Sequence, residues 1–182
     1  MYSDNDIKIA SDKPSKDIKK RAEFDLKDNS VYDKKALKKA RNWGKMVAER
    51  FIEDANDSAS GGEVEYYEML IQRRLLLSFT ATVAFENLSS NDTLSGVAQK
   101  SFIDTLKAAS DELYKTSSDT GAFSFYYLAF RRGSEIDRRI GQTFAMLCSH
   151  DGDPIYQELG EALYCWFSSV VKKAAEECGV IS

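Results

Sequence analysis

The stretch LLLSFTATVAF at positions 75–85 decides the fold class of this chain of 182 residues. Its eleven residues include no charged side chain, so apolar groups occur on every side of a helix drawn through it. Such a helix is stable when other helices surround it, which predicts a central position. We expect this helix to run from Glu63 to Asn87, because turn-forming sequences rich in small polar residues and glycine flank it at 56–62 and 88–96.

Amphipathic patterns on both sides of this stretch predict further helices. From Asp33 onward, apolar residues recur three and four positions apart, which places them on one stripe of a helix. That stripe consists of Leu37, Ala40, Gly44, Val47 and Phe51. Beyond the central helix, the same spacing predicts a third helix with a buried face formed by Phe102, Leu106, Ala109 and Leu113.

The last two helices are predicted together with their ends. Ser134 is the expected N-cap of the first of them, whose buried face consists of Ile136, Ile140, Phe144 and Leu147. Asp153 is the expected N-cap of the final helix. Pro154 suits the first helical position because the backbone N–H that proline lacks would have no hydrogen-bond partner there. Gly179 is expected in the left-handed position that follows the helix.

The segment GAFSFYYLAFRRG, residues 121–133, contains five aromatic residues in eight positions and suits either a helix or a buried strand. We predict a short helix, because no second segment has a strand pattern that could pair with a strand here. The whole chain is then an all-α protein. It has a single helical bundle-like domain of five long helices plus one short aromatic helix at 31–182, preceded by a polar N-terminal arm at 1–30.

The composition excludes several classes of protein. No apolar run reaches the roughly 18–20 residues that span a membrane, and the opening residues MYSDNDIKIA contain no apolar stretch typical of a secretion signal. We therefore expect a cytoplasmic protein that does not contact a membrane. The three cysteines, Cys148, Cys165 and Cys178, stand in apolar helical contexts and are expected to be buried free thiols.

Residues suited to catalysis or metal binding are sparse. The only histidine, His150, lies at the end of a predicted helix, and no G-x-S-x-G turn presents a serine to it. Glu65 and Glu68 have the spacing of a Glu-x-x-Glu metal motif. The second pair of carboxylates that such a site needs is missing, since Ser89 stands three residues after Glu86. With no phosphate-binding glycine loop either, we expect no enzyme activity, no catalytic residue, no metal and no cofactor.

The aromatic segment is the first candidate for a surface that binds a protein partner. Aromatic residues and arginine are enriched at protein interfaces, and arginine pairs follow this segment. The alternative is a core segment whose flanking charges protect it from aggregation. In the exposed case the segment, including Phe125, forms a groove or a homodimer contact. The predicted partner-binding residues are Phe123, Tyr126, Tyr127, Phe130, Arg131, Arg132, Arg138 and Arg139.

Charge is distributed unevenly along the chain. Residues 1–45 contain 13 Lys and Arg against 8 Asp and Glu, whereas the remaining residues contain 12 against 21. On the first helix the basic residues Lys34, Lys38, Arg41 and Lys45 are four, three and four positions apart, so they form a stripe beside the apolar one. Such a stripe can follow a phosphate backbone of nucleic acid. The alternative is a solvated face that balances the acidic body.

The missing catalytic signals favour a protein that acts by binding. We expect a non-enzymatic protein that docks on a larger protein, or on a second copy of itself, and regulates it. Accessory and inhibitor proteins of bacterial or phage origin, anti-CRISPR proteins among them, combine small size and acidity with missing catalytic motifs in this way. One alternative is a nucleic-acid-binding protein that uses the basic stripe. The other is a small-molecule pocket between helices, lined by Trp166 and the aromatic segment.

Overall fold

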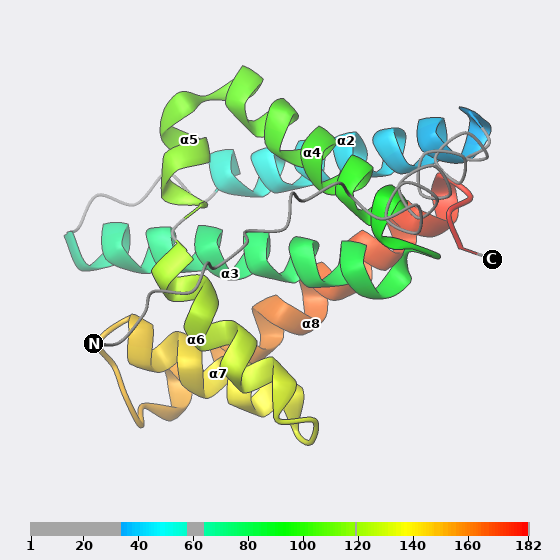
Figure 1. Ribbon diagram of the computed structural model, residues 1–182. Coiled ribbons are helices and arrows are strands. Elements are labelled where there is room, and N and C mark those ends of the chain that lie inside the picture. Colours follow the sequence, from blue (N-terminus) through cyan, green and yellow to red (C-terminus); the bar gives the residue numbers. More distant parts are fainter. Residues whose placement is uncertain (1–33, 58–63, 119, 182) are drawn as a thin grey trace, which may run out of the picture. The chain divides into compact units, whose positions relative to one another are not determined.

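Seven helices make up the part of the chain that the computed structural model describes, residues 34–57, 64–118 and 120–181 (Figure 1). In chain order they are α2 (Lys34–Asp57), α3 (Val64–Leu88), α4 (Asp92–Ala109), α5 (Asp111–Thr116), α6 (Thr120–Arg131), α7 (Ile136–Leu147) and α8 (Pro154–Glu177). No strand occurs among these residues, which confirms the all-α prediction. The arm predicted at 1–30 lies outside the described residues.

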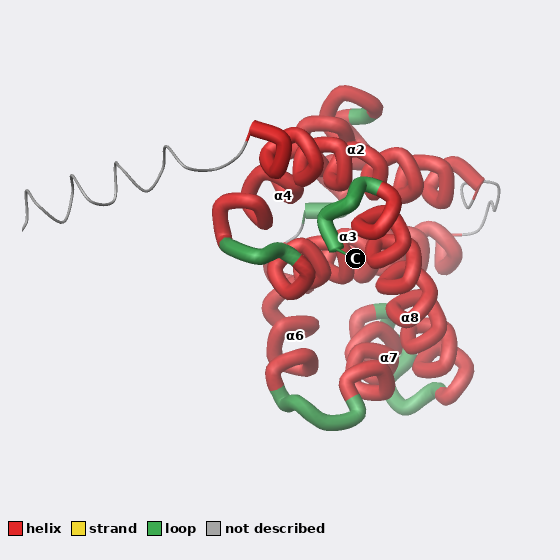
Figure 2. Tube along the Cα trace, turned by 90° about the vertical axis from the view of Figure 1, so that its right-hand side faces the viewer, coloured by secondary structure: helices red, strands yellow, loops and turns green. Residues whose placement is uncertain are grey.

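The helix α3 lies at the centre of the helical domain and contacts each of the other six described helices. In Figure 1 and Figure 2, α2 and α4 lie on one side of α3, and α6 and α7 lie on the other. Within the charge-free stretch 75–85 every residue is buried except half-buried Ala84. The predicted central helix is therefore confirmed, and the lack of a polar face on it is explained by neighbours on all sides.

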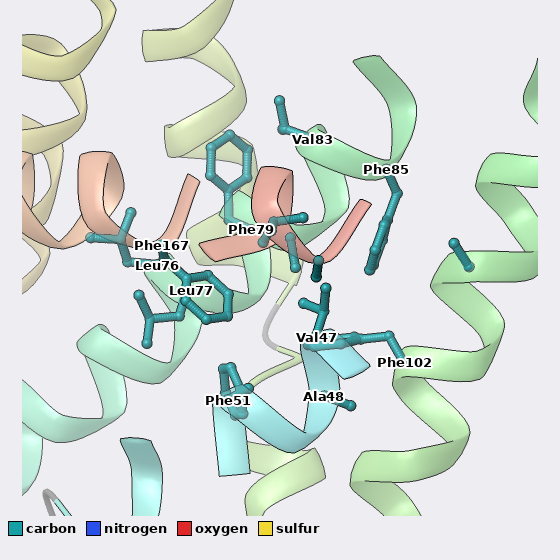
Figure 3. Packing of buried hydrophobic residues seen from close by; sticks show 14 of the residues in the cluster. Val47, Ala48, Phe51, Leu76, Leu77, Phe79, Val83, Phe85, Phe102 and Phe167 are labelled. Carbon is teal, nitrogen blue, oxygen red and sulfur yellow. The ribbon is translucent and has the colours of Figure 1, made fainter. Parts of the chain in front are cut away.

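Aromatic rings join α2, α4 and α8 in the core (Figure 3). Phe51 of α2 packs edge-on against Phe102 of α4 and Phe167 of α8, with ring centroids 5.8 and 6.3 Å apart. The indole of Trp43, also on α2, is fully buried, and its Nε1 donates a hydrogen bond to the Val171 carbonyl of α8 at 3.0 Å. The largest side chain of the core thus has its one polar group satisfied.

Two pairs of helices approach so closely that only glycine fits at the crossing. Gly44 of α2 lies against the backbone of α4, where a Cβ atom would overlap the Ala98 carbonyl oxygen. Gly141 of α7 lies in the same way against the Gln157 carbonyl of α8. The sequence pattern placed Gly44 correctly on the buried stripe of its helix, but the structure shows that its missing side chain is what allows the contact.

The third predicted helix is interrupted, so its predicted face needs a correction. Ser110 has extended backbone angles (φ −162°, ψ 123°), and its side chain accepts a hydrogen bond from the Leu113 amide at 3.2 Å. Serine competes with the helical backbone in this way and favours helix starts, so a new helix, α5, begins at Asp111. Leu113 is still buried, but Ala109 is exposed at the end of α4.

The predicted N-cap at Ser134 is wrong by one residue. The cap of α7 is Glu135, which has left-handed backbone angles (φ 51°, ψ 44°) and makes no capping hydrogen bond with its side chain. Because the chain makes this turn at Glu135, the Ser134 hydroxyl lies one residue before the capping position. It accepts a hydrogen bond from Arg139 at 3.4 Å instead.

Both predicted ends of α8 are confirmed. The Asp153 carboxylate accepts a hydrogen bond from the Ile155 amide at 2.8 Å, and Pro154 takes the first helical position. Beyond the other end, Gly179 has a φ of 65°, and the Val180 amide donates back to a carbonyl of the last turn at 2.8 Å. This left-handed glycine therefore ends the helix without leaving its last carbonyls unpaired.

The end of α7 has the same geometry, but Ser149 takes the left-handed position with a φ of 63°. A residue with a Cβ atom is strained there by about 1–2 kcal/mol, whereas glycine is not. We expect Ser149→Gly to raise the free energy of unfolding by about 0.5–1 kcal/mol in urea denaturation, after the greater chain entropy of glycine is subtracted. The reverse change at the end of α8, Gly179→Ser, should lower it by a similar amount. A loss of stability in Ser149→Gly would contradict this account.

Candidate functional site

The inner face of α6 packs around Phe79 of α3. The rings of Phe123, Tyr126, Tyr127 and Phe130 all have centroids within 6.4 Å of the Phe79 ring. Tyr126 is fully buried, and the other three are half-buried. The four aromatic residues predicted to bind a partner thus hold α6 against the core. Burial removes Tyr126 from the predicted partner surface altogether.

Neither tyrosine of this cluster is suited to acid–base chemistry at neutral pH. Burial raises the pKa of Tyr126, and its hydroxyl has no hydrogen-bond partner among the described residues. Burial and the nearby charge of Glu86 raise the pKa of Tyr127, whose hydroxyl lies 3.2 Å from the Glu86 carboxylate. Both phenols therefore stay protonated and act as packing groups.

The outer face of α6 forms one wall of a surface groove, and α7 forms the other. The groove has a volume of about 280 Å³, and Phe125, Leu128 and Met146 supply its apolar lining. These three side chains are 49%, 60% and 40% exposed. We call this feature the α6–α7 groove. Phe125 was part of the predicted surface, but Leu128 and Met146 were not, because the prediction weighed aromatic residues and arginine and left aliphatic residues aside.

Two of the four predicted arginines line the α6–α7 groove, namely Arg132 and Arg139, and Asp151 lies there as well. Arg132 is exposed and forms no ion pair with a described residue. Arg138 is instead exposed outside the groove and pairs with Glu135 at 3.6 Å. Of the predicted arginines, those at the groove are therefore Arg132, which directly follows α6, and Arg139 of α7.

The basic stripe of α2 is exposed along its length, as predicted, at Lys34, Lys38, Arg41 and Lys45. Arg41 and Lys45 also line a groove of about 470 Å³ between α2 and α4, where Lys100 of α4 joins them. Part of this charge is already balanced, since ion pairs join Lys45 to Glu49 at 3.6 Å and Lys100 to Asp104 at 3.1 Å.

The structure does not bring Trp166 and the aromatic segment into one pocket. Trp166 is 43% exposed and lines a groove of about 370 Å³ between α2 and α8, together with Met46 and Val170. The guanidinium of Arg73 lies 6.0 Å from the Trp166 ring and also forms an ion pair with Asp54. No residue of the aromatic segment lines this groove, although Phe123 lines a different pocket, described below.

Two of the remaining reactive side chains, His150 and Cys148, are packed against their neighbours. The ring of His150 stacks flat on Tyr156, with centroids 3.8 Å apart. Burial and the charge of Glu68 raise the pKa of the Cys148 thiol to about 12, so it is protonated at neutral pH. The expectation of buried thiols holds for Cys148 alone, because Cys165 is exposed and Cys178 is half-buried.

The described residues contain no cluster of three or more His, Cys, Asp or Glu side chains that could hold a metal ion. None of the described helices has the length and apolar character needed to cross a bilayer.

Comparison with known proteins finds no matching family model, no matching curated protein and no matching solved structure. What the protein does must therefore be inferred from its own surfaces.

Proposed function

We propose that this chain is a non-enzymatic docking protein of the cytoplasm that binds a larger partner protein through the α6–α7 groove and regulates or inhibits it. The observation that supports this proposal is the exposed apolar cluster of Phe125, Leu128 and Met146 beside two arginines. Bacterial or phage inhibitor proteins, including those of the anti-CRISPR class, are the kind of protein that acts in this way.

The chemistry of the groove defines its occupant. Its apolar residues come from two helices, and an amphipathic helix is the element that fits between two helices with apolar residues at positions i, i+3 or i+4, and i+7. Arg132 and Arg139 outnumber Asp151 at the groove, so the occupant should have carboxylates beside its apolar stripe. An arginine fork binds a carboxylate with two parallel hydrogen bonds, which fixes the direction of the bound helix.

Both walls of the groove are also closely packed against the rest of the domain, which favours binding. Its α6 wall is held by the four aromatic rings around Phe79, and its α7 wall is held by the close contact of Gly141 with α8. A preformed site loses little conformational entropy when a partner binds, so more of the contact energy remains as affinity.

The proposal predicts which surface changes abolish binding. We expect Leu128→Asp to weaken binding of the partner at least tenfold, because a charge replaces the most exposed apolar side chain of the groove. The matched control is Ile155→Asp, which changes a 73% exposed apolar residue outside the groove lining. A tagged protein would recover the partner from a lysate of the source organism, and the affinity of the purified pair would then be measured for each variant. Equal losses in both variants, at unchanged melting temperature, would refute the α6–α7 groove as the site.

A nucleic-acid-binding protein is the second candidate, and the position of Lys100 favours it. This residue of α4 extends the basic stripe of α2 across the groove between the two helices. Nuclease treatment of the same lysate separates the two proposals. A partner that disappears with nuclease, and also in a variant with Lys34, Lys38, Arg41 and Lys45 replaced by alanine, would assign the function to α2 and not to the α6–α7 groove.

A further inference from the structure

The charge-free stretch of α3 contains hydroxyl side chains as well as apolar ones, and two of them share one face. Ser78 and Thr82 are one helical turn apart, and each is 7% exposed. Both line a pocket of about 270 Å³, whose other walls come from α4, α5 and α6. The side chains of Ser78 and Thr82 are small, which leaves this space unfilled.

The pocket has a strongly apolar side. Phe102, Ile103 and Leu106 of α4 line it from one direction, and Phe123 of α6 lines it from another. Phe123 is fixed by its edge-on contact with Phe79, at a centroid distance of 6.0 Å. An aromatic or aliphatic body would therefore meet rigid apolar walls.

The break at Ser110 supplies the polar side of the pocket. Figure 1 shows α5 turning from the end of α4 toward α6, and Tyr114 of α5 and the following Ser117 and Ser118 line the pocket. The Ser118 hydroxyl donates to the Tyr114 carbonyl at 2.7 Å, which leaves its oxygen lone pairs as acceptors. The phenol of Tyr114 is a further donor.

None of the described residues that line this pocket carries a charge. An ion that entered would lose part of its hydration, and the described lining residues themselves carry no opposite charge to compensate it. A neutral ligand loses far less and can exchange its water hydrogen bonds for those of the pocket hydroxyls. The lining therefore selects for neutral molecules.

The geometry points to a binding site for a small neutral molecule with an apolar body and one or two hydrogen-bonding groups, in the pocket that α3, α4, α5 and α6 line. This site is separate from the α6–α7 groove and does not depend on the docking proposal. Its volume equals about nine water molecules in the liquid, which suits a ligand of roughly ten non-hydrogen atoms. An aromatic alcohol has this size and polarity.

The probe for this site is 2-phenylethanol, with phenylacetate and 2-phenylethylammonium as anionic and cationic analogues of similar size. Titration of the full chain, followed by NMR, should give saturable shifts of the signals from Ile103 and Leu106, with a Kd of about 1 mM or tighter. The two ions should bind at least tenfold more weakly, since none of the described lining residues compensates their charge. Absence of saturable shifts, or equal binding of all three probes, would overturn the proposal.

Variants locate the bound probe. Thr82→Leu fills the pocket and should weaken binding of 2-phenylethanol at least tenfold. Thr80→Val removes a buried hydroxyl from the same helix but does not alter the pocket lining, so it should bind the probe like the wild type. Ser118→Trp blocks the pocket from an exposed position and tests the same point even if Thr82→Leu fails to fold. Unchanged affinity in a folded pocket variant would place the probe elsewhere and overturn the proposal.

Discussion

Replacing Gly44 by alanine should lower the free energy of unfolding by about 3 kcal/mol. The added Cβ would overlap the carbonyl oxygen of Ala98, which belongs to the backbone of α4. A side chain could rotate away, but a helix backbone can yield only if α2 and α4 move apart. That movement would loosen the packing of Phe51 against Phe102, which depends on the same approach of the two helices. Urea or guanidinium denaturation measures the loss.

A second glycine provides the matched control for this change. Gly96 lies on α4, is exposed, and has no atom within 4 Å of the place where a Cβ would be added. Because alanine favours the helix more than glycine does, Gly96→Ala should raise the free energy of unfolding by about 0.5–1 kcal/mol. The same substitution thus has opposite signs at two positions. A wild-type stability for Gly44→Ala would show that the crossing is less tight than described.

Replacing Phe79 by alanine should cost about 3–5 kcal/mol of stability, the largest effect that we expect from a single substitution. Its ring is fully buried and contacts four aromatic rings of α6. The cavity left behind would be lined by rings that face one another across empty space. Denaturation measures the total loss, and amide hydrogen exchange should show that α6 loses protection first, because these rings are its main attachment to α3.

The control for this change lies on α6 itself. Phe125 is 49% exposed and lines the α6–α7 groove, so Phe125→Ala should change stability by less than about 1 kcal/mol. If docking occurs in the α6–α7 groove, Phe125→Ala should still weaken it, which separates binding from folding. Similar destabilisation by both changes would contradict the division of α6 into an inner and an outer face.

Helix periodicity and helix-capping rules were sufficient to predict much of the fold from the sequence. The stretch 75–85 predicted a central helix because a helix without a polar face needs neighbours all round. Asp153 begins α8 and Gly179 follows its end, as predicted, because the effect of each residue is confined to the adjoining helical turn. The third helix was predicted too long, since its apolar spacing continued through Ser110 while the serine side chain favoured a new start.

The candidate sites depended more on tertiary contacts. Phe125, Leu128 and Arg132 are three and four positions apart, so the sequence contained the outer stripe of α6 and the residue that directly follows the helix. Met146 completes the groove only after α7 packs beside α6. Lys100 likewise joins the basic stripe through the crossing of α2 and α4. The pocket that Ser78 lines could not be predicted from the sequence, because its volume depends on how four helices pack and where each of them ends.

The position of α3 has a consequence for how the domain responds to binding. Since α3 contacts every other described helix, no group of helices can separate without breaking part of its surroundings. Loss of any one helix therefore weakens the surroundings of the helix that the others share. A ligand that stabilises the helices on the α6 side of α3 would then also oppose unfolding of the helices on the α2 side. Binding at either surface would therefore raise the melting temperature of the whole domain.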